Sequence, residues 1–173
     1  MSKSNELNLL VREKREVAKD ILEFRFAAAD GSGLPSFSPG SHTAVTTPSG
    51  ANRQYSLIND GHQPAFYQIA VKLESESRGG SQSMHADLGV GDPVIVQAPE
   101  NSFPMVEASE YLFIGGGIGI TPLVGMAHFC DANDKAFRLI YCARTEEHAA
   151  YWEQLKSTFG DRVVIHFDGG DPE

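Results

Sequence analysis

The feature that most constrains the fold is a change in the pattern of apolar residues near Ala108. Before it, short stretches of alternating apolar and polar residues lie between turn residues, which is typical of half-buried antiparallel strands. After it, strand-like and helix-like stretches alternate, which is typical of a parallel sheet with crossover helices. The sequence therefore predicts two domains of different architecture, residues 1–107 and residues 108–173.

The first domain is predicted to be a six-stranded antiparallel barrel, because its short strands follow one another without a long helix. The alternation is strict in residues 22–26 (LEFRF), whereas Gln68 interrupts the apolar run of another strand. Ser81 is expected to cap a short helix over residues 82–88, which Gly89 ends. The predicted strands begin with one from Leu7 and continue with residues 22–26, 41–47, 53–58, 66–73 and 94–96.

The second domain is predicted to be a β-α-β-α-β unit, the first half of a doubly wound nucleotide-binding sheet. Residues 111–114 (YLFI) form an apolar run of the kind buried on both faces. Thr121 is expected to cap a helix with Pro122 at its first position, and Glu146 and Glu147 to open the next helix. The remaining strands are residues 137–143 and 163–167. Because no later strands follow, we infer a piece of a longer protein or one completed by a partner, with residues 111–114 at an exposed edge.

Charge and composition exclude several classes of function. The 14 Lys and Arg residues against 23 Asp and Glu residues give a net charge of -9, which argues against nucleic acid and anionic membranes as partners. The apolar stretch near the N-terminus is too short for a signal peptide or a membrane span, so a cytoplasmic protein is expected. Cys130, Cys142 and the six histidines lack metal-ligand spacing, so no metal site is expected.

Residues 53–57 (RQYSL) are the first candidate for ligand binding. In a strand, Arg53, Tyr55 and Leu57 share one face while Gln54 and Ser56 share the other. A guanidinium, a flat ring and short polar groups suit a planar ligand that carries a phosphate. An ordinary edge strand can carry the same five residues, which is the alternative interpretation.

Two glycine-rich turns are candidates for phosphate binding. Residues 115–122 (GGGIGITP) lie where a strand meets a helix, although Pro122 replaces the third glycine of the dinucleotide-binding fingerprint. Residues 78–81 (RGGS) place a cation before a helix start. A turn needed only for tight packing and a solvated loop are the respective alternatives. Together the motifs suggest two phosphorylated ligands that meet where the domains join.

The order of the motifs at residues 53–57, 70–72 (AVK), 78–81 and 116–122 resembles the ferredoxin-NADP reductase superfamily, and within it the reductase components of Rieske oxygenases. The resemblance implies FMN as the flavin, with FAD less favoured, and NADH as the electron donor, with NADPH possible. It further implies a terminal oxygenase or ferredoxin-type electron acceptor, and we expect a monomer. Asn101 and Phe103 match the subgroup that binds FMN.

The resemblance also implies roles for individual residues. Arg53 would face the flavin phosphate, Tyr55 would lie against the isoalloxazine, and Thr121 would reach the flavin from the second domain. Further flavin-binding residues would be Gln54, Ser56, Ala70, Val71, Lys72, Arg78, Gly79, Gly80 and Ser81. Gly116, Gly117 and Gly119 would let the nucleotide approach closely, and Pro122 is a further cofactor-binding candidate. Arg144 is a candidate for a ribose or 2′-phosphate contact, a solvated arginine being the alternative. No catalytic residue is expected, because the chemistry belongs to the cofactor.

The sequence departs from the family pattern in two respects. Such reductases continue into a strand that ends in Cys-Gly-Pro, and many add a [2Fe-2S] domain; neither occurs in these 173 residues. A [2Fe-2S] cluster is therefore expected only in a region beyond Glu173. The alternatives are a free flavin reductase, a reductase with a haem partner, and a non-catalytic flavin-binding module.

Overall fold

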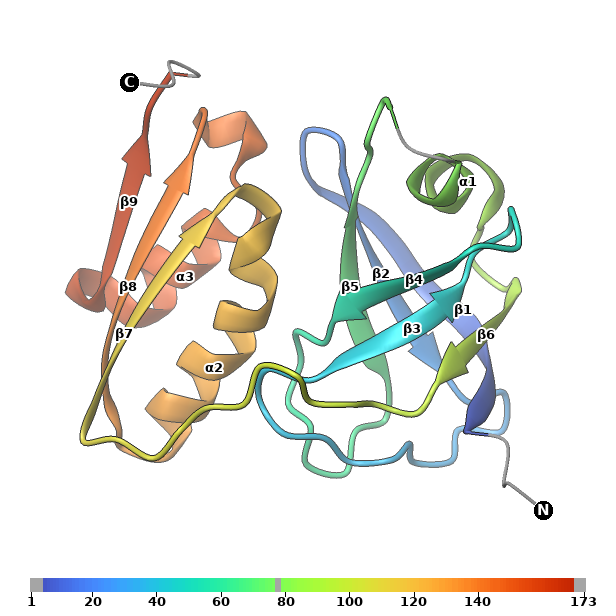
Figure 1. The fold of residues 1–173 in the computed structure, drawn as a ribbon, viewed down its shortest axis with the longest axis horizontal. Coiled ribbons are helices and arrows are strands. Elements are labelled where there is room, and N and C mark those ends of the chain that lie inside the picture. The colour runs from blue at the N-terminus through green and yellow to red at the C-terminus, as the bar shows by residue number, and fades with distance from the viewer. Residues whose placement is uncertain (1–4, 77–78, 170–173) are drawn as a thin grey trace.

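The chain forms two sheets that lie side by side, as seen in a computed structural model that describes residues 5–76 and 79–169 (Figure 1). The first sheet has six antiparallel strands in the order β4-β3-β6-β1-β2-β5, and the second has three parallel strands in the order β7-β8-β9. The first sheet and its helix comprise β1 (Glu6–Ala18), β2 (Ile21–Ala27), β3 (His42–Thr46), β4 (Asn52–Ser56), β5 (Tyr67–Lys72), α1 (Gly80–Asp87) and β6 (Pro93–Gln97). The predicted six-stranded antiparallel architecture is confirmed.

The six-stranded sheet curls into a barrel around an apolar core. Its edge strands β4 and β5 approach each other just beyond Ser56, where the Ile58 N–H donates to the Gln68 carbonyl at 3.0 Å. Phe24, Phe26 and Ile69 point into the core and are fully buried. Closure of this kind removes the open edges of a sheet.

The second sheet is covered by helices on one face. It comprises β7 (Glu110–Gly116), the short turn η1 (Gly117–Ile120), α2 (Thr121–Ala132), β8 (Ala136–Ala143), η2 (Glu146–His148), α3 (Trp152–Phe159), η3 (Gly160–Arg162) and β9 (Val163–Phe167). Phe137, Leu139 and Tyr141 of β8 share one core with side chains of both α2 and α3. Both helices therefore pack on the same face, as successive right-handed crossovers in one direction require.

The opposite face of this sheet corrects one prediction. Residues 111–114 were expected to be buried on both faces, but Leu112 and Ile114 are 61% and 65% exposed. No described helix covers that face, and β7 has β8 as its single partner among the described strands. The predicted exposed edge is therefore confirmed.

Three helix starts differ from the prediction. Ser81 and Thr121 do not cap their helices, since α1 begins at Gly80 after Gly79 and α2 begins at Thr121 itself. The helix expected from Glu146 is broken, because η2 ends at His148 and Tyr151 then adopts a left-handed conformation (φ 64°) before α3. The break has a tertiary cause, namely contacts of Glu147 and Tyr151 with the barrel.

The two sheets are joined by an apolar contact. Ile21, Ile58 and Ala70 on the outside of the barrel belong to the same buried cluster as Ile120 and Val124. Figure 1 shows α2 on the side of the second sheet that faces the barrel. None of the described helices is long and apolar enough to cross a membrane.

Candidate functional site

The structure brings Arg53 and the start of α1 into contact. A Cβ atom added at Gly80 would lie 2.9 Å from Arg53 Nε, so a side chain there would require the guanidinium to move. The preceding residue, Gly79, has φ 85°, a left-handed conformation that glycine adopts without strain. A helix start built from glycine above a fixed cation combines two features that bind a phosphate.

Tyr55 and its neighbours continue this site along β4. The Arg53 guanidinium is held in place by donating from Nη1 to the Asn52 carbonyl at 2.8 Å. Tyr55 is half-buried, and burial raises the pKa of its hydroxyl, so the ring is neutral near pH 7. Gln54 is exposed and Ser56 is half-buried on the other face of the strand. The arrangement offers a flat neutral surface next to a guanidinium, which fits the flavin mononucleotide that the sequence predicts.

β5 supplies the next wall of the site. Ala70 and Val71 are buried, whereas Lys72 is exposed and forms an ion pair with Glu74 at 3.0 Å. The Val71 carbonyl already has a partner, because His85 Nε2 of α1 lies 2.8 Å from it. Sequence reasoning missed His85. Its contact ties α1 to β5 and leaves the Val71 carbonyl less available to a ligand.

The glycines of the turn after β7 fall into two groups, according to whether a Cβ atom would fit. A Cβ at Gly115 would meet Leu123 at 2.9 Å and Ile120 at 3.3 Å, so Gly115 is required for internal packing. At Gly116, Gly117 and Gly119 a Cβ would meet nothing within 4 Å. Packing inside the chain therefore does not explain these three glycines. Gly117 has φ 51°, a left-handed conformation that favours glycine, whereas for Gly116 and Gly119 the close approach of a nucleotide stays a prediction.

We predict that Gly116→Ala lowers affinity for NADH at least tenfold while leaving the fold intact. Its backbone is extended (φ -122°) and has space for a Cβ, so the melting temperature should stay within about 2 °C of wild type. Gly115→Ala is the contrast, since overpacking of this kind costs about 1–3 kcal/mol. Thermal unfolding and NADH titration of both variants check the prediction, and unchanged NADH affinity in Gly116→Ala would contradict it.

Thr121 and Pro122 lie at the start of α2, where the Thr121 hydroxyl donates to the Ile118 carbonyl at 3.0 Å. Thr121 is only 6% exposed, so its hydroxyl fixes the turn in this structure and its predicted contact with a flavin stays a prediction. Arg144 is exposed just after β8, and the register sets Gly116 beside Cys142 at the same end of the sheet. The nucleotide candidates therefore share one edge.

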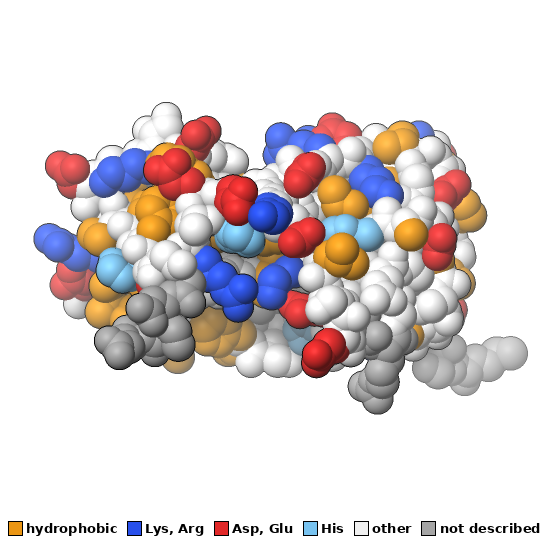
Figure 2. Space-filling model, turned by 90° about the horizontal axis from the view of Figure 1, so that it is seen from above, with side chains coloured by type: hydrophobic (Ala, Val, Ile, Leu, Met, Phe, Trp, Pro, Cys, Tyr) orange, Lys and Arg blue, Asp and Glu red, His pale blue; other side chains and the backbone are white. Residues whose placement is uncertain are grey.

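Of the remaining predicted residues, Asn101 and Phe103 lie elsewhere. Arg78 falls outside the described residues. The Asn101 amide donates to the Pro39 carbonyl at 3.0 Å and to Ser38 Oγ at 2.7 Å, so its side chain fixes a loop of the barrel. Phe103 is 55% exposed in the connection between the sheets. Viewed from above, Lys and Arg side chains gather in the hollow between the two halves of this acidic molecule (Figure 2).

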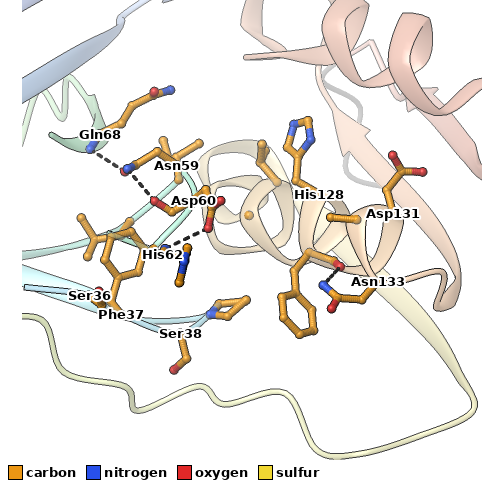
Figure 3. Close-up of a pocket in the computed structure, with 18 of the residues that line it drawn as sticks. Ser36, Phe37, Ser38, Asn59, Asp60, His62, Gln68, His128, Asp131 and Asn133 are labelled. Atoms are coloured by element: carbon orange, nitrogen blue, oxygen red, sulfur yellow. Dashed lines mark hydrogen bonds between the residues drawn. The ribbon is translucent and has the colours of Figure 1, made fainter. Parts of the chain in front are cut away.

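A cavity of about 850 Å³ also lies between the barrel and the helices of the second sheet (Figure 3). Asp60, His62, His128 and Asp131 line it, and its described lining contains no Lys or Arg. Burial lowers the pKa of His128, so this imidazole is neutral near pH 7. Because none of the predicted cofactor-binding residues lines the cavity and its carboxylates would repel a phosphate, it is distinct from the site at Arg53.

The structure also reveals functional candidates that were not predicted. Glu23, only 1% exposed, accepts hydrogen bonds from Gln68 and Tyr151. The interruption of an apolar run by Gln68 was the visible signal, whereas the alternation in residues 22–26, typical of a half-buried strand, did not indicate that Glu23 is covered. It is buried because the second half of the chain covers that face of β2.

Comparison with solved structures identifies the class of fold. The chain matches phthalate dioxygenase reductase, described as a modular structure for electron transfer from pyridine nucleotides to [2Fe-2S], with a TM-score of 0.94 and 39% identity over 96% of this chain and 53% of that one. It also matches an intact type IV self-sufficient cytochrome P450 monooxygenase, with a TM-score of 0.90 and 34% identity over 95% of this chain and 21% of that one. The fold is that of the ferredoxin reductases.

Sequence comparison identifies relatives of the chain among the oxygenase reductase components. The chain is 41% identical over 179 aligned residues to the phthalate 4,5-dioxygenase oxygenase reductase subunit of Pseudomonas putida, which covers 99% of this chain and 55% of the relative. No protein-family profile matches the chain. The chain has the ferredoxin reductase fold and is a homologue of the oxygenase reductase components, as the sequence motifs indicated. It spans about half the length of the relatives that it matches.

Proposed function

We propose that the chain is the flavin-binding and nucleotide-binding part of an NADH-dependent flavoprotein reductase. Residues 1–107 would form the FMN-binding barrel, and residues 108–173 would form part of the nucleotide-binding domain. The proposal rests on the contact between Arg53 and the glycine start of α1, next to the neutral ring of Tyr55. FMN is favoured over FAD because a single phosphate suffices for this cation and helix start.

The residues of the chain have three tasks in this proposal. Arg53, Gly80 and Ser81 hold the phosphate, and Tyr55 supports the ring. The open glycines 116, 117 and 119 let the nucleotide approach from the second sheet, with Arg144 near its ribose. When bound, FMN supplies hydride acceptance from NADH and onward transfer of single electrons, so the protein contributes position and exclusion of water rather than an acid or base.

The proposed electron acceptor is an iron-sulfur centre that serves a terminal oxygenase. The relatives named as oxygenase reductase components support this choice. This chain has two cysteines, and a plant-type cluster needs four, so the centre would belong to another region or another chain. The likeness to a self-sufficient cytochrome P450 supports a haem acceptor as the second candidate. We further propose a cytoplasmic monomer.

The proposal is tested by titrating the purified chain with FMN and FAD and then adding NADH or NADPH anaerobically. We expect the chain to turn yellow and to bind FMN more tightly than FAD. We also expect its flavin absorbance to fall faster with NADH than with NADPH. A folded chain that binds neither flavin would overturn the proposal. Exchange of bound FMN with free flavin at every turnover would favour a free flavin reductase instead.

A further inference from the structure

The segment between β8 and α3 ties the second sheet to the barrel at two points. The Lys19 N–H, in the turn between β1 and β2, donates to the Glu147 carbonyl at 2.7 Å. The Tyr151 hydroxyl donates to Glu23 Oε2 at 2.9 Å. Both bonds run from the second half of the chain to the β1–β2 hairpin, so this hairpin is the fixed support of the contact.

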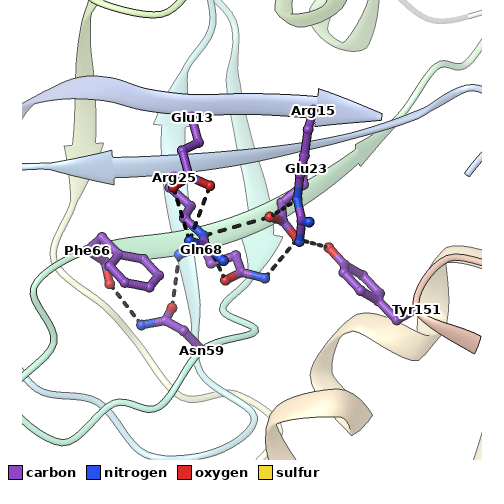
Figure 4. Close-up of polar contacts among 8 residues, drawn as sticks. All are labelled: Glu13, Arg15, Glu23, Arg25, Asn59, Phe66, Gln68 and Tyr151. Atoms are coloured by element: carbon purple, nitrogen blue, oxygen red, sulfur yellow. Dashed lines mark hydrogen bonds and ion pairs between the residues drawn. The ribbon is translucent and has the colours of Figure 1, made fainter. Parts of the chain in front are cut away.

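Glu23 is held rigidly enough to act as an anchor (Figure 4). Arg15 donates to it from Nε at 2.8 Å and from Nη2 at 3.2 Å, and Gln68 Nε2 donates at 2.8 Å. Arg25 Nε lies 3.7 Å from the same carboxylate. A buried carboxylate with several donors around it has one well-defined position, because moving it would leave buried charges without partners.

Tyr151 contacts Glu23 from a strained backbone conformation. Its φ of 64° lies in the left-handed region, which is strained for a residue with a bulky side chain. Burial, followed by the negative charge of Glu23, raises the pKa of Tyr151 well above its ordinary value, so its hydroxyl stays a proton donor. A strained tyrosine whose hydroxyl reaches a buried carboxylate persists because the surrounding contacts fix it.

Hydrogen bonds such as Tyr151–Glu23 restrict the orientation of the two halves more narrowly than the apolar contact between them does. The apolar contact around Ile58, Ala70 and Val124 is not directional, whereas a hydrogen bond fixes both distance and angle. The cavity of about 850 Å³, which Tyr151 and Gln68 also line, leaves one side of the junction unpacked. The orientation of the two halves therefore depends on the Tyr151–Glu23 and Lys19–Glu147 hydrogen bonds as well as on packing.

We infer that Tyr151 and Glu23 are positioning residues that set the angle between the barrel and the second sheet, and with it the placement of the nicotinamide against the flavin. This inference rests on the proposed function for its second part. Because reacting groups displaced by about 1 Å lose on the order of 100-fold in rate, a small rotation between the halves is sufficient to affect hydride transfer.

Tyr151→Phe tests the inference, since it removes one hydroxyl and keeps the ring. The matched control is Tyr67→Phe, which removes a buried hydroxyl that donates to Pro35 within the barrel at 2.8 Å. Residual dipolar couplings of the ligand-free chain report the relative alignment of the two sheets. In wild type and in Tyr67→Phe we expect the two sheets to share one alignment tensor. In Tyr151→Phe we expect each sheet to have a different tensor. We also expect the rate of flavin reduction at saturating NADH to fall about tenfold in Tyr151→Phe, with the Kd values of FMN and NADH unchanged within about twofold.

Each outcome decides one part of the inference. A single tensor in Tyr151→Phe would refute the role of Tyr151 in orientation. Divergent tensors with an unchanged reduction rate would refute its role in placing the nicotinamide. Equal slowing in Tyr67→Phe would show a general effect of lost stability and would also refute the inference. If the wild-type chain binds no flavin, the proposed function fails, while the tensors still decide whether Tyr151 sets the angle.

Discussion

Replacing Arg53 with alanine is expected to weaken FMN binding about 100-fold. The guanidinium lies beside Gly80, the first residue of α1. A hydrogen bond to a charged group contributes about 1.5–3 kcal/mol, which corresponds to about 10- to 150-fold in Kd. Titration of the ligand-free chain with FMN, followed by flavin fluorescence, measures the change.

Two further variants separate charge from geometry in this experiment. Arg53→Lys keeps the charge but loses the planar fork, so we expect an intermediate loss of about tenfold. Arg138→Ala removes an exposed cation from the open face of the second sheet and should leave FMN binding unchanged. An Arg53→Ala chain that binds FMN as tightly as Arg138→Ala does would place the phosphate elsewhere.

The sequence predicted the architecture well because both halves follow simple periodicities. Alternation of apolar residues predicted the barrel strands, and β9 has the predicted bounds at residues 163–167. The motif order also predicted which segments would meet. Arg53 and Gly80 are in contact, although they are 27 positions apart in the chain. Local pattern and tertiary structure agree at these places because each strand buries one face against its own domain.

The sequence predicted the junction between the halves poorly. Glu23 alternates with core residues in a strand predicted to be half-buried, and nothing in the sequence indicated that the second half of the chain covers it. The helix expected over residues 146–159 is interrupted because Glu147 and Tyr151 contact the barrel, and such long-range contacts leave no periodic signal. Leu112 and Ile114 show the reverse error, since their apolar character indicated a second covered face that no described element provides.

Gly40→Ala is expected to destabilise the chain by about 3 kcal/mol, because it combines backbone strain with a collision. Gly40 has φ 88°, and a Cβ there would lie 2.0 Å from the Phe103 carbonyl oxygen and 2.8 Å from Met126 Cε. Three segments meet at this point, namely the turn before β3, the connection between the sheets and α2. The Asn101 amide bonded to Pro39 restricts how far the connection can move away.

Gly50→Ala isolates the backbone contribution. Gly50 has nearly the same conformation (φ 81°), but a Cβ there would meet nothing within 4 Å. Its expected cost is therefore the strain alone, about 1–2 kcal/mol. Urea unfolding of both variants gives the difference, which we assign to the collision with Phe103 and Met126. Equal losses in the two variants would mean that the connection yields without cost, and the two halves would then be joined less firmly at Gly40 than the close contact indicates.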